Sequence, residues 1–372
     1  MKKLHLLAGA IAALMAASGS AASASTLFTV TNLVTDDPMA HPAQITDPNL
    51  VNPWGISYAP GSPFWVSDNG SGKATLYNVA PSANTTSKVG LDVTIPGDGS
   101  VTGQTYNPGA AFNGDRFLFA SEDGTISGWR AALGTTAEVL QLPSDAVYKG
   151  ITLGTSGSFS YLYAANFRRG AIDVLKGTAG APDLTGRFTD PNLPAGYAPF
   201  NIANLGGSLY VSYAVQDAGK HDEVPGAGMG IVDVFDLQGN LIQRLATGGL
   251  LNAPWGLAIA PSSFGDLAGE LLVGNFGDGA IDAFDLSGQN PKLPEALKDS
   301  HGDPIAIDGL WGLIPGSGGN GGDTGSIYFS AGPDGETHGL FGVIATVPEP
   351  GSGALAVMGL LSLALTRRWQ PG

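Results

Sequence analysis

Polar residues of types suited to binding a hard cation follow several hydrophobic runs in this chain. Carboxylates and side-chain amides supply the oxygen ligands that Ca²⁺ prefers. They stand in turns such as "VSDNGSG" at Val66 and "VGNFGDG" at Val273. The candidates are Asn52, Asp68, Asn69, Asn107, Glu122, Asp123, Asn166, Asn275, Asp278 and Asp334. From these we select Asp68, Asn69, Glu122, Asn166, Asn275 and Asp334 as a metal or ligand face.

A simpler interpretation of these residues is that tight turns need them, because Asn and Asp bond their own backbone there. No spacing among them is diagnostic of a metal, so we favour the turn interpretation. The loop Gln216–Gly228 suggests a lid or partner contact, with His221, Asp222 and Glu223 expected as a solvated charged tip. No nucleophile and base stand at a defined spacing, so the sequence supports no catalytic triad.

A repeated phrase indicates which elements position these turns. Its forms are "NPWGISYAP" at Asn52, "NPGAAF" at Asn107, "YKGITLG" at Tyr148, "APFNIANLG" at Ala198, "APWGLAIAP" at Ala253 and "GLWGLIP" at Gly309. Each precedes an aromatic strand-like run, a Gly turn and a further strand-like run. This order predicts an all-β, six-bladed propeller over residues 26–346. A β-sandwich is the alternative, but it does not predict a fixed order.

The fourth strands are less regular, with "GRFTD" at Gly186 one of the candidates, and the last repeat has no room for its own. The surplus run "TLFTVTNLVTD" at Thr26 is therefore expected to pair beside Leu340–Ala345. Such pairing closes the ring and leaves no open sheet edge in that blade.

The Trp-Gly pairs themselves are interpreted as scaffold. Glycine allows the innermost strands to approach closely near the axis, and tryptophan would fill the wedge between adjacent blades. A ligand-stacking platform is the alternative role for the tryptophans. The residues concerned are Trp54, Gly55, Trp255, Gly256, Trp311 and Gly312.

Composition excludes several classes of protein. The 372 residues include 56 Gly and 25 Pro, which favours many short strands and turns. With no Cys the chain has no disulfide, cannot be a thiol enzyme and cannot be a thiolate zinc protein. A formal net charge of −15 disfavours binding to nucleic acid. The Gly-rich segment Gly316–Gly325 opens no helix and is expected to be a flexible loop.

Both ends of the chain contain patterns that predict where the protein is sorted. Residues 1–24 carry Lys2 and Lys3, an apolar run and Ala22-Ser23-Ala24, which is typical of a secretory signal peptide. Residues 347–372 contain Pro348-Glu349-Pro350, an uncharged run and Arg367-Arg368. An uncharged run ending in a basic pair favours a transmembrane helix whose basic end stays in the cytoplasm.

This tail resembles a PEP-CTERM sorting signal. The resemblance implies that Pro348, Glu349 and Pro350 are the recognition motif, that Arg367 and Arg368 are the basic stop, and that an exosortase-type membrane protease removes the tail. It also implies a host that makes exopolysaccharide. The "NPWG", "APWG", "VSDNGSG" and "VGNFGDG" segments resemble a family of secreted bacterial propellers and, more distantly, NHL-type and lactonase-type six-bladed propellers.

Two functional hypotheses follow. The first, which we favour, is an exported, non-enzymatic propeller that binds a polysaccharide or protein at the cell envelope or in the extracellular matrix, held in the inner membrane only until its tail is removed. The second is a metal-dependent hydrolase or lyase of the lactonase-like class. No cofactor is assigned from the sequence, and Ca²⁺ is the candidate if the polar face binds a metal.

Overall fold

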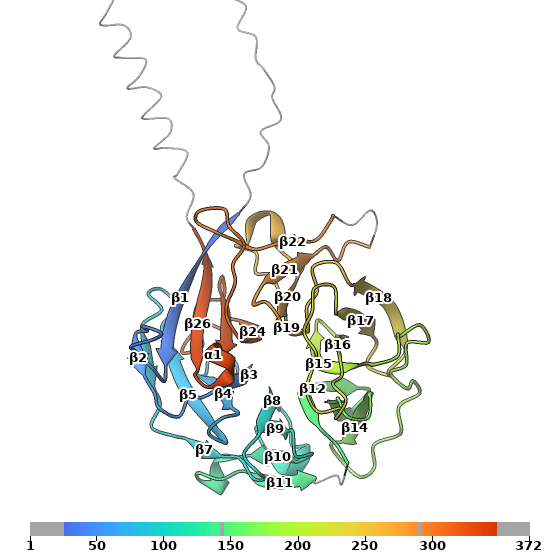
Figure 1. The fold of residues 1–372 in the computed structure, drawn as a ribbon. Coiled ribbons are helices and arrows are strands. Elements are labelled where there is room, and N and C mark those ends of the chain that lie inside the picture. The colour runs from blue at the N-terminus through green and yellow to red at the C-terminus, as the bar shows by residue number, and fades with distance from the viewer. Residues whose placement is uncertain (1–25, 142–144, 289–291, 348–372) are drawn as a thin grey trace, which may run out of the picture.

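Six β-sheets surround a common axis in the computed structural model, which describes residues 26–141, 145–288 and 292–347 (Figure 1). Each sheet is a blade. In the first five blades the main strands follow one another outward from the axis in chain order, whereas the outer strands of the sixth blade come from elsewhere in the chain. The six-bladed propeller predicted from the repeats is therefore confirmed.

The first three blades contain the strands between residues 53 and 176. Blade one comprises β3 (Pro53–Ser57), β4 (Phe64–Asp68), β5 (Lys73–Val79), β6 (Thr86–Lys88) and β7 (Val93–Thr94). Blade two comprises β8 (Val101–Tyr106), β9 (Phe117–Ser121), β10 (Ile126–Trp129) and β11 (Glu138–Gln141). Blade three comprises β12 (Tyr148–Ser156), β13 (Phe159–Asn166) and β14 (Ala171–Lys176).

The last three blades complete the ring. Blade four comprises β15 (Tyr197–Leu205), β16 (Ser208–Val215), β17 (Ile231–Phe235) and β18 (Leu241–Thr247). Blade five comprises β19 (Pro254–Ile259), β20 (Leu271–Asn275), β21 (Ile281–Phe284) and β22 (Glu295–Ala296). Blade six comprises β24 (Leu310–Pro315), β25 (Ile327–Ala331), β26 (Leu340–Thr346), β1 (Leu27–Thr35), β2 (Ile45–Thr46) and β23 (Lys298–Asp299).

The helical segments are single turns in the loops. They are η1 (Phe112–Gly114), η2 (Ala131–Leu133), η3 (Gly265–Leu267) and α1 (Pro333–Glu336). In the part of the chain that the structure describes, no helix is long and apolar enough to cross a membrane. The predicted signal peptide and the predicted tail, including Pro348, Glu349, Pro350, Arg367 and Arg368, lie outside the described residues.

In blade two the innermost strand lies at a different place in the sequence from the one predicted. Its innermost strand is Val101–Tyr106, which pairs with Phe117–Ser121, whereas "NPGAAF" forms the following loop. Asn107 closes that loop by donating to the carbonyls of Ala111 and Asp115. Asn107 therefore lies at the end of an innermost strand, on the face opposite the other candidate residues. Blade three also departs from expectation, because "GRFTD" (Gly186–Asp190) is not a strand in the described structure.

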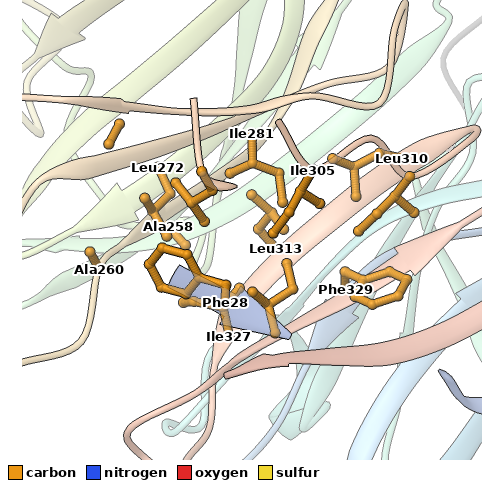
Figure 2. Packing of buried hydrophobic residues seen from close by; sticks show 14 of the residues in the cluster. Phe28, Ala258, Ala260, Leu272, Ile281, Ile305, Leu310, Leu313, Ile327 and Phe329 are labelled. Atoms are coloured by element: carbon orange, nitrogen blue, oxygen red, sulfur yellow. The ribbon is translucent and has the colours of Figure 1, made fainter. Parts of the chain in front are cut away.

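The first strand of the described chain closes the ring as predicted. β1 pairs antiparallel with β26 in a register that runs from Phe28 opposite Thr346 to Thr35 opposite Leu340. Phe28 enters the core between blades five and six, among Leu272, Ile281, Leu313 and other apolar side chains (Figure 2). The first and last strands of the described chain are thus joined by backbone hydrogen bonds and by buried apolar surface.

A second connection between the last and first blades involves the segment Gly316–Gly325. The backbone N–H of Val79 donates to Asn320 O, and that of Gly322 donates to Val79 O. The N–H of Asn320 also donates to Gly61 O. The expected flexible loop is instead held against blade one.

Small residues allow the innermost strands to approach one another. A Cβ at Gly55 would lie 2.7 Å from Thr102 O, one at Gly256 2.9 Å from Trp311 O, and one at Gly312 2.7 Å from Trp54 O. Such distances exclude any larger side chain unless the backbone moves. In blade four the equivalent position of the innermost strand is occupied by Asn201 and not by a glycine. The Asn201 side-chain amide donates to Trp255 O.

The three tryptophans pack on one another, with Phe200 and Phe276 around them. Trp311 of blade six contacts Trp54 of blade one and Trp255 of blade five, so both contacts join neighbouring blades. The ring centroids of Trp54 and Trp311 are 3.5 Å apart, and Trp255 meets both edge-on. Together these rings close the centre of the propeller. Below them an axial cavity of about 250 Å³ is lined by residues of the innermost strands, including Gln104, Asn204 and Leu257.

A histidine next to β26 gives this closure a predicted pH dependence. Asp36, directly after β1, bonds His338 Nδ1 and accepts from Gly339 N. This hydrogen bond raises the pKa of His338 above its ordinary 6.5, and the nearby Asp37 and Asp334 act in the same direction. Because the folded-state pKa is raised, the stabilisation is complete below 6.5 and is lost as pH rises through the folded-state value.

We therefore expect His338→Gln to lower the unfolding temperature at about pH 5.5 and to have little effect at about pH 8.5. Thermal unfolding followed by circular dichroism at both pH values measures this. His301→Gln, on an exposed turn, is the matched control and should change neither midpoint. An equal loss at both pH values for His338→Gln would contradict the assigned ion pair.

Candidate functional site

The candidate site lies at the face where the innermost strands begin, here called the mouth. At its centre is Lys149 on β12, in the position where β3, β19 and β24 each carry a tryptophan. Its side chain is only 1% exposed. Its Nζ lies 5.1 Å from the centroid of the Trp54 ring, so the closed aromatic centre forms the floor beneath it.

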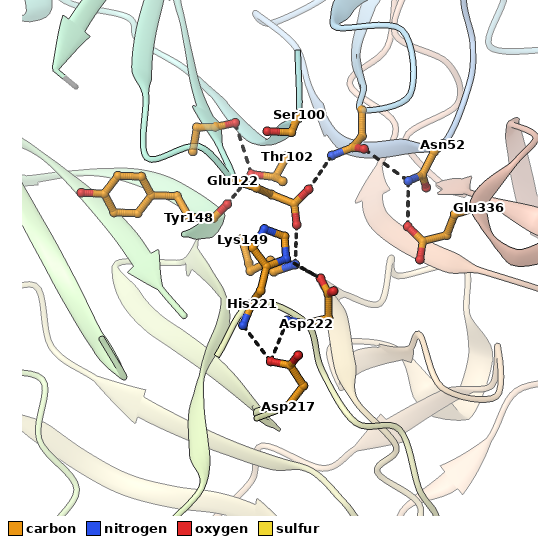
Figure 3. A network of polar contacts seen from close by, with 12 residues as sticks. Asn52, Ser100, Thr102, Glu122, Tyr148, Lys149, Asp217, His221, Asp222 and Glu336 are labelled. Atoms are coloured by element: carbon orange, nitrogen blue, oxygen red, sulfur yellow. Dashed lines mark hydrogen bonds and ion pairs between the residues drawn. The ribbon is translucent and has the colours of Figure 1, made fainter. Parts of the chain in front are cut away.

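Carboxylates from two other blades hold the ammonium group in place. Nζ donates to Glu122 Oε1 at 2.5 Å and to Asp222 Oδ1 at 3.3 Å (Figure 3). Glu122 follows β9 in blade two, and Asp222 belongs to the loop between β16 and β17 in blade four. A buried cation with these partners is paired and hydrogen-bonded, as a buried charge must be.

The hydrogen bonds continue around the axis. Asn69 Nδ2 donates to Glu122 Oε2 at 3.1 Å, and Asn52 Nδ2 donates to Glu336 Oε2 at 2.7 Å and to Asn69 Oδ1 at 3.5 Å. Trp311 Nε1 donates to Asn52 Oδ1 at 3.1 Å, which ties the chain of bonds to the aromatic floor. We call Asn52, Asn69, Glu122, Lys149, Asp222 and Glu336 the axial network (Figure 3).

Burial and nearby charges shift the pKa values of several side chains in and beside the axial network. Burial raises the pKa of Glu223 to about 7, with Glu336 and Asp222 adding to the rise and Lys149 opposing it. Burial also raises the pKa of Glu336. For Lys149, burial lowers the pKa, but Glu122, Glu223 and Asp222 outweigh burial and hold it above its ordinary value. A carboxyl group that titrates near neutral pH beside a fixed cation can donate or accept a proton.

The mouth also gathers a set of ligands suitable for a metal ion. Glu122, His221 and Asp222 each offer one ligand atom, and these atoms lie within 4.8 Å of one another. Two carboxylates and an imidazole match the ligand preferences of several divalent cations. Lys149 already pairs with both carboxylates, so a cation would compete with its ammonium group.

The loop Gln216–Gly228 differs from the expected solvated tip because it folds over the mouth. Asp217 Oδ1 accepts from the backbone N–H of His221 and of Asp222, which shapes the loop. At its far end Gly226 N donates to Asn252 Oδ1. The side chain of Asp222 is still 64% exposed, but Glu223 is half-buried beside the axial network.

The structure separates the six residues selected from the sequence. Asn69 and Glu122 belong to the axial network. Asp68, Asn166 and Asn275 are buried within their blades, where the amides of Asn166 and Asn275 donate to Asp173 and Asp282. Asp334 lies at the rim and bonds His41 Nε2 at 2.7 Å. The six side chains do not converge on one point.

The sequence interpretation missed Lys149 and Glu336 and misplaced Asp222 and Glu223. For Lys149 a signal was present, because "YKG" aligns with "PWG" and puts a charged residue where the other repeats hold tryptophan. For Glu336 the signal is weaker. It follows Asp334 and Gly335 in a turn where all three residues have positive φ, which no repeat pattern reveals.

Comparison with known proteins gives relatives but no matching family model. Uncharacterized protein R648 of Acanthamoeba polyphaga mimivirus is 32% identical over 325 residues, covering 80% of this chain and 76% of the relative. Uncharacterized protein L690 of the same virus is 32% identical over 321 residues, covering 80% of both chains. Among solved structures, a glucose dehydrogenase superposes with a TM-score of 0.52 at 13% identity, over 86% of this chain and 99% of that one, which shows a shared fold alone. By the extent of these alignments, the chain belongs to the same family as the mimivirus proteins R648 and L690.

Proposed function

We propose that this chain is an exported propeller that binds a saccharide of the extracellular matrix at its mouth. The observation that carries the proposal is the axial network, which brings amide, carboxylate and ammonium groups from several blades to one place. Converging polar groups over an aromatic floor provide donors and acceptors for hydroxyl groups. Most of the network is paired internally, which suits recognition better than an activated nucleophile.

The position of the chain ends supports this proposal. β24 begins at the mouth, and β26 runs in the same direction because both pair antiparallel with β25. β26 therefore ends on the opposite face, where Val347 N donates to Leu27 O. If residues 348–372 hold the chain in the inner membrane as the sequence predicts, the mouth points away from that membrane toward the medium.

Affinity electrophoresis of the full-length chain in detergent tests the binding proposal. We expect gels that contain dextran or alginate to slow the chain, and Asn69→Ala to lose this retardation. Thr29→Ala, at an exposed position of β1, is the control and should migrate like the original chain. The proposal fails if neither polysaccharide slows the chain or if both variants behave alike.

The sorting part of the proposal has its own experiment. Replacing Pro348-Glu349-Pro350 with three alanines should leave an unprocessed precursor in the membrane fraction of the producing cell. Immunoblots of membrane and medium measure this. Normal maturation of the variant would refute processing by an exosortase-type protease.

A second candidate function, a metal-dependent hydrolase or lyase, is favoured by the cluster of Glu122, His221 and Asp222. A divalent cation held there would polarise a substrate carbonyl or lower the pKa of a water molecule. Calorimetry of the full-length chain with Ca²⁺ or Zn²⁺ tests it. Uptake at one site that Asp222→Asn abolishes would support it, with Asp278→Asn on the same face as control. Absence of uptake would end it.

A further inference from the structure

A pocket beside the axial network contains a hydrogen-bond donor that has no partner among the described residues. Its volume is about 330 Å³, comparable to small ligand sites. The lining residues are Asp98, Ser100, Glu122, Asp123, Ala146, Arg168 and His221. Three of them, Ser100, Glu122 and His221, are drawn together in Figure 3. The pocket thus lies between blades two and three and beneath the loop that folds over the mouth.

The acidic residues of this pocket are already used within the protein. Glu122 accepts from Lys149 with one oxygen and from Asn69 with the other. Asp123 accepts from the backbone N–H of Thr125 and of Asp98. Asp98 Oδ1 accepts from Ser100. These carboxylates hold the turns of blade two, and Glu122 is in addition paired with the ammonium group of Lys149.

Arg168 is the residue whose bonding is incomplete. It follows β13, in the turn whose carbonyl groups accept from Gln216 Nε2. Its Nε is buried and has no hydrogen-bond partner in the part of the chain that the structure describes. Because Nε is shielded from solvent, a ligand would meet the rest of the Arg168 side chain, which is partly exposed and lines the pocket. A guanidinium group pairs best with a planar carboxylate through two parallel hydrogen bonds.

We propose that this pocket binds the carboxylate of a uronic acid residue, with Arg168 as its partner. The inference rests on the proposed function and names the kind of saccharide. The surrounding carboxylates disfavour phosphate and other anions of higher charge, so a single carboxylate suits the pocket best. Ser100 and the exposed Asp98 supply polar groups for the sugar hydroxyls.

Two methyl glycosides that differ only at C6 test this inference on the full-length chain in detergent. We expect methyl glucuronide to bind about tenfold or more tightly than methyl glucoside by calorimetry, because only the former pairs with a guanidinium. Arg168→Met should remove the difference, and Arg168→Lys should retain part of it, because lysine keeps the charge but lacks the planar fork.

Arg169→Met is the matched control, since the neighbouring Arg169 is exposed and pairs with Asp145 instead. It should preserve the preference for glucuronide. Equal binding of the two glycosides, or loss of the preference in Arg169→Met, would overturn the inference and leave the proposed saccharide function in place. Equal affinity for inorganic phosphate would also overturn it, by indicating a general anion site. Binding of neither glycoside, together with failure on dextran and alginate, would overturn both proposals.

Discussion

Replacing Phe28 with alanine should lower the free energy of unfolding by about 3–5 kcal/mol. Phe28 is 1% exposed and its ring centroid lies 4.8 Å from that of Phe264. It belongs to β1, which pairs with the last strand of blade six, so the cavity left by its removal opens between blades five and six. Urea unfolding of the full-length chain, followed by tryptophan fluorescence, measures the change.

Val30→Ala on the same strand is the matched control. Val30 is 39% exposed, so its truncation should cost less than about 1 kcal/mol. If both substitutions lowered stability equally, or if neither did, β1 would not contribute to the closure as described.

Replacing Lys149 with methionine should destabilise the chain by about 3–5 kcal/mol, the range found when one partner of a buried ion pair is removed. Methionine fills a similar volume but leaves Glu122, a mostly buried carboxylate, without its cation. Glu336 and Glu223 would also lose a stabilising charge. Chemical unfolding at pH 7.5 measures the loss.

A second substitution separates charge from packing. Lys149→Met combined with Glu122→Gln should recover much of the stability, because the uncompensated carboxylate is gone. Lys176→Met removes an ammonium group whose partner Asp183 is 93% exposed, and it should change stability by less than about 0.5 kcal/mol. If the double variant were no more stable than Lys149→Met alone, the ion pair would not account for the loss.

The sequence predicted the ring well because the repeated signals are local. The phrase at Asn52, Ala253 and Gly309 marks innermost strands, and the missing last strand indicated the role of Leu27–Thr35. The innermost strand of blade two was predicted in the wrong place because "NPGAAF" shares Asn-Pro and Gly with the repeat. The glycine that packs against the innermost strand of the next blade is Gly103. There the true phrase is "VTG", which has no aromatic residue to identify it.

The site was only half predictable, for a physical reason. Asn69 and Glu122 stand next to strand ends, so the fold alone brings them to the mouth. Asp222 reaches the axis through a loop, and it meets Lys149 from 73 positions away in the chain. Asn166 and Asn275 have the same residue types as ligands, yet they satisfy buried backbone and side-chain partners. Asp68 is buried within its blade, and its carboxylate has no hydrogen-bond partner among the described residues. Composition does not distinguish these two uses of a polar side chain.

The pairing of β1 with β26 sets an order of events during biosynthesis. Thr29 and Ala345, which face each other in that pairing, are separated by 316 positions. At the usual pace of translation, the earlier residue waits roughly 15 to 60 s for its neighbour. Until β1 and β26 pair, the first and last blades are not joined, and chaperones can act on the open chain during that interval. The ring therefore cannot close until the last blade has been synthesised.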